Sequence, residues 1–435
     1  MQTAAQPIVA SWLKGRLPFF YGWVILACLC CCGFARQGPA VATLSIFVEP
    51  MTSEFDWSRT ALSGAVSLGG ILAALTSPLI GPLLDRRGAR IMLCAAVLLT
   101  GISTMLLSLI QSIVGFYLLF CIARMNFAGP FDIGIYGAVN SWFLVRRAIV
   151  NGIIGLAQMV GLVLMPLIAH SAMRADGWRG GWLAVGSTVL LIGLLPAWLV
   201  LVRRPEDLGL LPDGGPPAPD PVGAAAGTPV AVAEPQFSRA QALRTPAFWL
   251  LSLYTVAVYP VQAGISLHQA PHLLESGLSP TVAATVVSTF SFAAAVAGLG
   301  FGLVARRMGL PTLLALSGVA LGTSALLMLK IAAAWQAYLA ACCFGAGIGG
   351  ILTLLPLAWA DYFGRASFGA IRGVALSLQV TAQAAGPLLS GLLRDASGNY
   401  MLSLAAFAAL SFFGALIAVL VRPPRPPARR LPAAP

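Results

Sequence analysis

The sequence predicts an all-α membrane protein in which twelve transmembrane helices form two pseudo-symmetric six-helix bundles. Three observations support this fold class. Hydrophobic residues make up 58% of the 435 residues and charged residues only 9%, whereas soluble proteins carry roughly 25% charged residues. The chain repeats itself at a constant offset of 221 residues. Its basic residues fall mostly on alternate loops, as expected of a chain that crosses a membrane many times.

The apolar runs are interpreted as helices because lipid offers no hydrogen-bond partners to backbone groups. About 20 apolar residues cross a bilayer as a helix, whereas barrel strands alternate in polarity over about 10 residues. These runs are too long and too continuously apolar for barrel strands. The twelve predicted spans lie near residues 20–45, 60–83, 91–111, 113–140, 148–169, 181–202, 246–267, 281–304, 310–329, 334–359, 370–393 and 400–421.

The internal repeat needs no gap. Residues 81–88 align with residues 302–309, and three further positions, Gly152, Pro166 and Gly177, align with Gly373, Pro387 and Gly398. A repeat of half an apolar chain predicts two equivalent bundles, an architecture typical of secondary transporters. We therefore expect a cytoplasmic N-terminal tail at 1–18, a first bundle at 19–202, a cytoplasmic linker at 203–245, a second bundle at 246–421 and a cytoplasmic C-terminal tail at 422–435.

The distribution of basic residues predicts the orientation. With the amino terminus in the cytoplasm, 19 of the 26 Lys and Arg residues lie in inner segments, Arg365 and Arg372 among them, and five lie in outer segments. This excess predicts that both termini are cytoplasmic and that the protein is integral to the plasma (inner) membrane. The net charge of +12 then reflects topology and contact with membrane lipid, and we expect no nucleic-acid partner.

The sequence contains no signature of an enzyme. The eight cysteines fall inside predicted spans, where thiols behave as small hydrophobic side chains. No metal-ligand cluster, nucleophile–histidine pair or nucleotide-binding loop is evident in the sequence. We therefore predict no metal, no cofactor and no catalytic residues.

One loop carries the strongest motif. Residues 81–90 read Gly-Pro-Leu-Leu-Asp-Arg-Arg-Gly-Ala-Arg, which resembles the loop between helices 2 and 3 of the major facilitator superfamily. The resemblance implies that this loop holds the cytoplasmic gate shut against helix 11, through the gating residues Gly81, Asp85, Arg86, Gly88 and Arg90. The alternative is a basic turn that only sets topology. The second half has Arg306 where the first has Asp85, which predicts an asymmetric gate.

Three other stretches narrow the resemblance. Residues 21–24 (Tyr-Gly-Trp-Val), 203–214 and 242–249 are similar to segments of the monocarboxylate porter and oxalate–formate antiporter branch, and the resemblance covers about residues 15–425. It implies secondary active transport of a small organic anion, with a monocarboxylate as the expected substrate, by rocking-bundle alternating access that is proton-coupled or exchange-driven. In this superfamily helices 1, 4, 7 and 10 line the central cavity.

Two arginines lie deep inside predicted spans, Arg36 in the first and Arg124 in the fourth. A charge at that depth costs about 2.5–3.5 kcal/mol on insertion scales, so it must face water or an internal partner. Two guanidinium groups facing the cavity would bind a carboxylate. The alternative is a structural role, with Arg124 binding backbone carbonyls and Arg36 lying near the outer mouth.

Further candidates come from polar residues within spans. Asp132, in the fourth span, is either a proton-coupling residue or the partner of an inner-loop arginine. The substrate-binding candidates in the second half are Tyr259, Gln262, Gln379 and Gln383. The eighth span has no charge before Arg306, and helix 11 is expected to offer only glutamines. The sequence thus predicts that the positive field comes from the first half.

Two other functions remain open. Efflux of drugs or other metabolites by the same fold would suit a large apolar cavity with few charges. A membrane sensor that does not transport is the third reading, although the tails are short for an effector region. We expect a monomer with a small organic anion as its substrate, and both coupling to protons and exchange of anions remain open.

Overall fold

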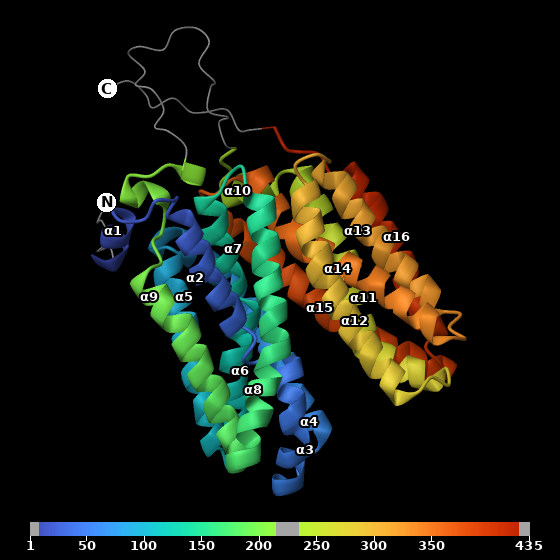
Figure 1. Ribbon diagram of the computed structural model, residues 1–435. Coiled ribbons are helices and arrows are strands. Elements are labelled where there is room, and N and C mark those ends of the chain that lie inside the picture. Colours follow the sequence, from blue (N-terminus) through green and yellow to red (C-terminus); the bar gives the residue numbers. More distant parts are fainter. Residues whose placement is uncertain (1–7, 215–234, 426–435) are drawn as a thin grey trace, which may run out of the picture.

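The computed structural model describes residues 8–214 and 235–425, and every regular element in these ranges is a helix. The helices form two bundles, one from each half of the chain (Figure 1). The bundles approach each other at the end of the molecule where α1 (Ile8–Lys14) and α10 (Arg239–Leu243) lie, and they splay apart toward the opposite end. We refer to these as the α10 end and the far end.

The first bundle contains the six predicted spans in eight helical segments. Its helices are α2 (Gly22–Ala35), α3 (Val41–Phe55), α4 (Arg59–Arg87), α5 (Ala89–Leu106), α6 (Ile113–Ala128), α7 (Pro130–Trp142), α8 (Arg147–Val189) and α9 (Leu195–Leu199). The second bundle contains one helix for each span. Its helices are α11 (Pro246–Glu275), α12 (Pro280–Val304), α13 (Leu310–Met328), α14 (Ala334–Phe363), α15 (Phe368–Ser397) and α16 (Met401–Leu420).

Helix breaks explain why segments and spans differ in number. The first span is interrupted after Ala35, and α3 continues it from Val41. The fourth span is interrupted at Gly129, which separates α6 from α7. The fifth and sixth spans form one helical run that reverses at Gly177, where φ is 63°. The equivalent turn of the second half has Gly398 with φ of 76°. A positive φ favours glycine because it has no Cβ, so the duplication preserves glycine at both turns.

Length and composition identify the membrane crossings. Among the described residues, nine helical segments are long and apolar enough to span a bilayer. One of them, Arg147–Leu199, contains the reversal at Gly177 and supplies two crossings. The remaining two crossings are α2, which is only 14 residues long, and α15, which carries several charged and amide side chains.

The surface of the bundles is apolar. Leu75, Leu79, Phe292 and Leu388 are 68%, 75%, 73% and 68% exposed. Such exposure of large apolar side chains would be unfavourable in water, so these faces of the helices contact lipid. Several charged residues lie instead where the two bundles meet, among them Asp85, Asp132 and Arg372, and that region contains the candidate site.

Candidate functional site

The break in the fourth span positions the central acid. Gly129 has φ of −112° and ψ of −89°, and Pro130 follows it as the first residue of α7. Proline suits the first turn of a helix because its missing N–H would have no partner there. Asp132 lies in this first turn and is only 5% exposed. Its carboxylate therefore lies near a helix N-terminus, where the helix dipole favours negative charge.

Asp132 binds two arginines from different bundles. Its Oδ1 accepts hydrogen bonds from Nε and Nη2 of Arg372, at 3.2 and 2.9 Å. Its Oδ2 lies 3.6 Å from Nη2 of Arg36, which caps the end of α2. Arg372 belongs to α15 of the second bundle and is 1% exposed. A buried ion pair therefore joins the two halves of the protein.

This arrangement corrects the expectation that helix 11 offers only glutamines and that the positive field comes from the first half. Arg372 is the fifth residue of α15 and not part of an inner loop. Charge counting alone assigned it to the loop because it lies close to Arg365 in the sequence. A helical signal was available, since Gln379 and Gln383 follow Arg372 by seven and eleven residues, a spacing that places all three on one helix face.

Arg36 is held by groups of its own bundle. Its Nε donates to the carbonyl oxygen of Phe127 at 2.8 Å, just before the break in the fourth span. Its Nη1 donates to Oε1 of Gln158 at 3.3 Å, and Nε2 of Gln158 donates to the hydroxyl of Tyr136 at 3.4 Å. These contacts fix the guanidinium of Arg36, and both are shorter than its 3.6 Å distance to the carboxylate of Asp132.

Arg124 lies beside Arg36. The guanidinium carbons of Arg36 and Arg124 lie 4.7 and 4.3 Å from the centroid of one ring, that of Phe127. Cations attract aromatic faces, so this ring helps to hold two like charges near each other. The Nε of Arg124 is buried without a hydrogen-bond partner, and no carboxylate in the described ranges lies within ion-pair distance of Arg124. Arg124 is thus a partly buried cation of this region that has no anion within ion-pair distance among the described residues.

The four candidates of the second bundle lie on two neighbouring helices, α11 and α15. Nε2 of Gln383 donates to Oε1 of Gln262 at 3.0 Å. Gln379 is 7% exposed, and its Oε1 has no partner. Tyr259 is 3% exposed and within electrostatic reach of Arg372 and Asp132. Within the described residues, no hydrogen bond joins the glutamines to Arg36 or Arg124. Tyr259 therefore lies near the ion-pair cluster. The glutamines Gln262, Gln379 and Gln383 lie on α11 and α15 and, in the part of the chain that the structure describes, do not bond to it.

The candidate gating loop contacts α15 through two of its residues. Oδ1 and Oδ2 of Asp85 accept hydrogen bonds from the backbone N–H groups of Gly369 and Ala370, at 2.9 and 2.8 Å. A carboxylate of one bundle therefore caps the first turn of a helix in the other. A Cβ on Gly81 would lie 2.0 Å from the carbonyl oxygen of Gly369, so the two backbones touch.

The other three residues of the loop lie elsewhere. Nη2 of Arg90 donates to the carbonyl oxygen of Trp198 at 2.9 Å. The guanidinium carbon of Arg90 lies 5.2 Å from the centroid of the Trp198 ring, so both contacts stay within the first bundle. Arg86 is exposed. Gly88 has φ of 84°, which permits the tight turn between α4 and α5. Arg90 and Gly88 therefore shape the loop, while Asp85 and Gly81 make its contact with the other bundle.

Additional polar contacts join the bundles at the α10 end. Nη1 of Arg147 in α8 lies 3.0 Å from Oδ1 of Asp361 in α14. Arg365, just before α15, donates to the carbonyl oxygen of Ser141 at 3.0 Å and forms an ion pair with Glu206. These contacts and the Asp85 cap hold the bundles together at this end.

Glycine lets the bundles meet along two seams. In the first seam, α4 contacts α15, and a Cβ on Gly373 would lie 2.4 Å from the carbonyl oxygen of Ser77. In the second seam, α8 contacts α12, and a Cβ on Gly302 would lie 2.7 Å from the carbonyl oxygen of Ala148. Gly81 and Gly302 are equivalent in the repeat. The seams are thus two copies of one interface, but only the first carries the Asp85 cap.

Comparisons with known proteins agree with this architecture. A family model described as the Major Facilitator Superfamily matches residues 25–268, more than half of the chain. Among solved structures, the chain superposes on the fucose:proton symporter FucP of E. coli with a TM-score of 0.66 at 12% identity, covering 93% of this chain and 100% of that one. This likeness concerns the fold alone, and with the family match it confirms the predicted fold of twelve helices in two bundles.

The chain also resembles curated transporters. It is 26% identical to monocarboxylate transporter 11 of Homo sapiens over 434 residues, covering 96% of this chain and 85% of that one. It is 28% identical over 182 residues to the probable L-galactonate transporter of Escherichia coli (strain K12), covering 40% of this chain and 37% of that one. It is 25% identical over 211 residues to the oxalate:formate antiporter of Oxalobacter formigenes, covering 48% and 45%. The chain therefore spans less than half the length of the latter two relatives.

Proposed function

Because the chain belongs to the Major Facilitator Superfamily, we propose that it carries a small organic anion across the plasma (inner) membrane by rocking-bundle alternating access. A monocarboxylate is the proposed substrate. It is a multi-pass membrane transporter of a small molecule and not an enzyme. The relatives that carry monocarboxylates or exchange oxalate for formate support an anionic substrate for this chain as well.

The single observation that carries the substrate class is the excess of positive charge within the spans, where Arg372 is buried and Arg36 and Arg124 are partly buried. Arg36 and Arg372 share the one carboxylate of Asp132, and Arg124 lies beside Arg36 on the ring of Phe127. Buried charges require partners because the bilayer core does not solvate them. A substrate carboxylate beside Arg36 and Arg124 would supply the missing negative charge, and guanidinium groups bind carboxylates with two parallel hydrogen bonds. Tyr259, Gln262, Gln379 and Gln383 would contact the remainder of such a substrate.

With both termini in the cytoplasm, as the positive-inside rule predicts, the α10 end is the cytoplasmic end. The contacts that join the bundles at that end would then close the cytoplasmic side, and the far end would face outward. In this arrangement Asp85 and Gly81 act as gating residues, and Arg86, Gly88 and Arg90 shape the gating loop. Asp132 is the proposed coupling residue, since its protonation would release Arg372 and loosen the contact between the bundles.

The test replaces Arg124 by Gln, with Arg174→Gln in the exposed far-end turn as the matched control. Losing a charged hydrogen bond costs about 1.5–3 kcal/mol, so carboxylate counterflow by purified Arg124→Gln protein in liposomes should fall by about tenfold or more. The control variant should transport normally. Normal carboxylate counterflow by Arg124→Gln would remove this arginine from the mechanism. Uptake of lipophilic cations in place of carboxylates would support the efflux alternative.

A further inference from the structure

The repeat places two glutamates at the same point of the two halves. Glu54 lies near the end of α3, which extends the first span toward the far end, and Glu275 is the last residue of α11. Their numbers differ by the repeat offset of 221. Each binds an arginine at the turn between the fifth and sixth helices of its own bundle, Arg179 or Arg394. We call Glu54–Arg179 the first clamp and Glu275–Arg394 the second clamp.

Both clamps hold a helix that is weakened by proline. Pro39 and Pro260 are equivalent in the repeat. Around Pro39 the helix stops altogether, between Ala35 and Val41, while Pro260 lies inside α11. Proline removes a backbone hydrogen bond and bends a helix. The segment beyond each proline can therefore move relative to its bundle unless the clamp restrains it.

The first clamp is strongly supported. Arg179 makes two contacts with the carboxylate of Glu54, at 2.7 and 3.1 Å, and Nε1 of Trp178 donates to the same carboxylate at 2.6 Å. Beneath it, Phe55 stacks on Trp57 with ring centroids 4.4 Å apart and meets Trp178 edge-on at 5.8 Å. Removing one ion pair would leave this aromatic packing in place.

The second clamp is weaker. Nη2 of Arg394 meets Oε1 of Glu275 at 2.9 Å, and Asp395 competes for the same guanidinium at 3.8 Å. Asn399 occupies the position equivalent to Trp178, so no indole supports this carboxylate. Two polar contacts restrain the end of α11, this ion pair and the hydrogen bond between His272 and the carbonyl oxygen of Met328.

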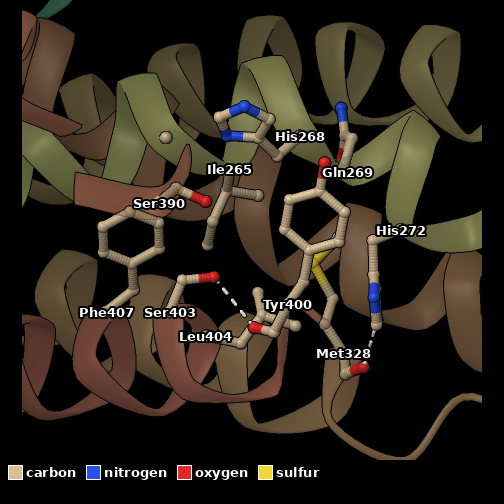
Figure 2. Close-up of a pocket in the computed structure, with 11 residues that line it drawn as sticks. Ile265, His268, Gln269, His272, Met328, Ser390, Tyr400, Ser403, Leu404 and Phe407 are labelled. Carbon is tan, nitrogen blue, oxygen red and sulfur yellow. Dashed lines mark hydrogen bonds between the residues drawn. The ribbon is translucent and has the colours of Figure 1, made fainter. Parts of the chain in front are cut away.

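The packing below the second clamp is also incomplete. A pocket between α11, α13, α15 and α16 is lined by His268, Gln269, His272 and Tyr400 among others (Figure 2). Nδ1 of His268 and both amide atoms of Gln269 are buried without partners. His272 bonds the carbonyl oxygen of Met328 at 2.8 Å. Unpartnered buried polar groups destabilise packing, so this region resists movement less than its aromatic counterpart.

From these differences we propose that the second clamp is the latch of the outer gate and that the first clamp is a fixed anchor. Release of Glu275 from Arg394 lets the end of α11 swing toward the first bundle and close the far end. Glu54 and Arg179 keep α3 attached to its own bundle throughout. The inference rests on the proposed alternating access, but it assigns residues and an order of movement that do not depend on the substrate.

The first measurement is hydrogen exchange of the purified full-length protein, with Glu275→Gln and Glu54→Gln as a matched pair. Exposed ion pairs contribute modestly to stability, so Glu275→Gln should speed exchange at residues 267–278 by roughly two- to fivefold. Glu54→Gln should change exchange at residues 48–58 by less than about twofold. The exchanged pair Glu275→Arg with Arg394→Glu should restore the slow rate.

The second measurement separates a latch from a structural support. In a chain whose native cysteines are alanine, a cysteine replacing Gln383 is alkylated by a water-soluble maleimide. If the far end closes on release, Glu275→Gln should slow alkylation by roughly two- to fivefold. Unchanged alkylation, or an effect of Glu54→Gln equal to that of Glu275→Gln, overturns the proposal. A protein that responds as expected but moves no carboxylate retains the latch and loses the proposed substrate.

Discussion

Replacing Asp132 by Asn would test the ion pair between the bundles. The change leaves Arg372, which is 1% exposed, without a carboxylate partner. Removing one member of a buried pair costs about 3–5 kcal/mol, far more than the ~0–1 kcal/mol of an exposed pair. Because the pair crosses the interface, this cost falls on the arrangement in which the α10 end is closed. The balance should therefore shift toward opening at that end by on the order of a hundredfold or more.

The assay follows a cysteine that replaces Ala74, which is 8% exposed in α4. In a chain without other cysteines, its alkylation rate reports separation of α4 from α15. Asp132→Asn should raise this rate strongly, whereas the double variant Asp132→Asn with Arg372→Gln should lie close to the parent, because neither charge is then left unpaired. Equal rates for the parent and Asp132→Asn, or effects of the two single changes that simply add in the double variant, would refute the reasoning.

Two further predictions concern the seam and the first clamp. Gly81→Ala places a methyl group 2.0 Å from the carbonyl oxygen of Gly369, and overpacking costs about 1–3 kcal/mol, so the cysteine at position 74 should react about fivefold faster or more. Gly155→Ala, which meets nothing within 4 Å, should leave that rate unchanged. Hydrogen bonds from Arg179 and Trp178 hold the pKa of Glu54 below its usual value of 4.5. The first clamp should therefore remain intact above that value and be lost only as pH falls through the lower folded-state pKa, which carbon NMR of the Glu54 carboxyl group measured against pH would show.

The sequence alone predicted the fold because lipid removes most alternatives. Long apolar runs must be helices in a bilayer, and the 221-residue repeat divides them between two bundles. The helix breaks at Gly129 and around Pro39 were not predicted. Both occur inside runs that hydropathy assigns to a single span, and hydropathy does not report a local change of backbone angle.

The candidate site was predicted only in part. Arg36, Arg124 and Asp132 stood out because a charge inside a span is costly. Arg372 was missed because it lies near the start of its helix, where charge counting cannot separate a loop from a first turn. The clamps were also missed, since Glu54 and Glu275 are ordinary surface acids until the repeat and the folded turns bring each beside an arginine.

The duplicated glycine seams have a consequence for how such a molecule can move. Where Gly81 faces Gly369, and where Gly302 faces Ala148, main chain lies against main chain with little side-chain bulk between them. Surfaces without protruding side chains can tilt against each other without any side chain having to repack. Each seam can then act in turn as the axis about which the two halves rotate. The hydrocarbon-facing sides of the helices keep their contact with the bilayer during this rotation.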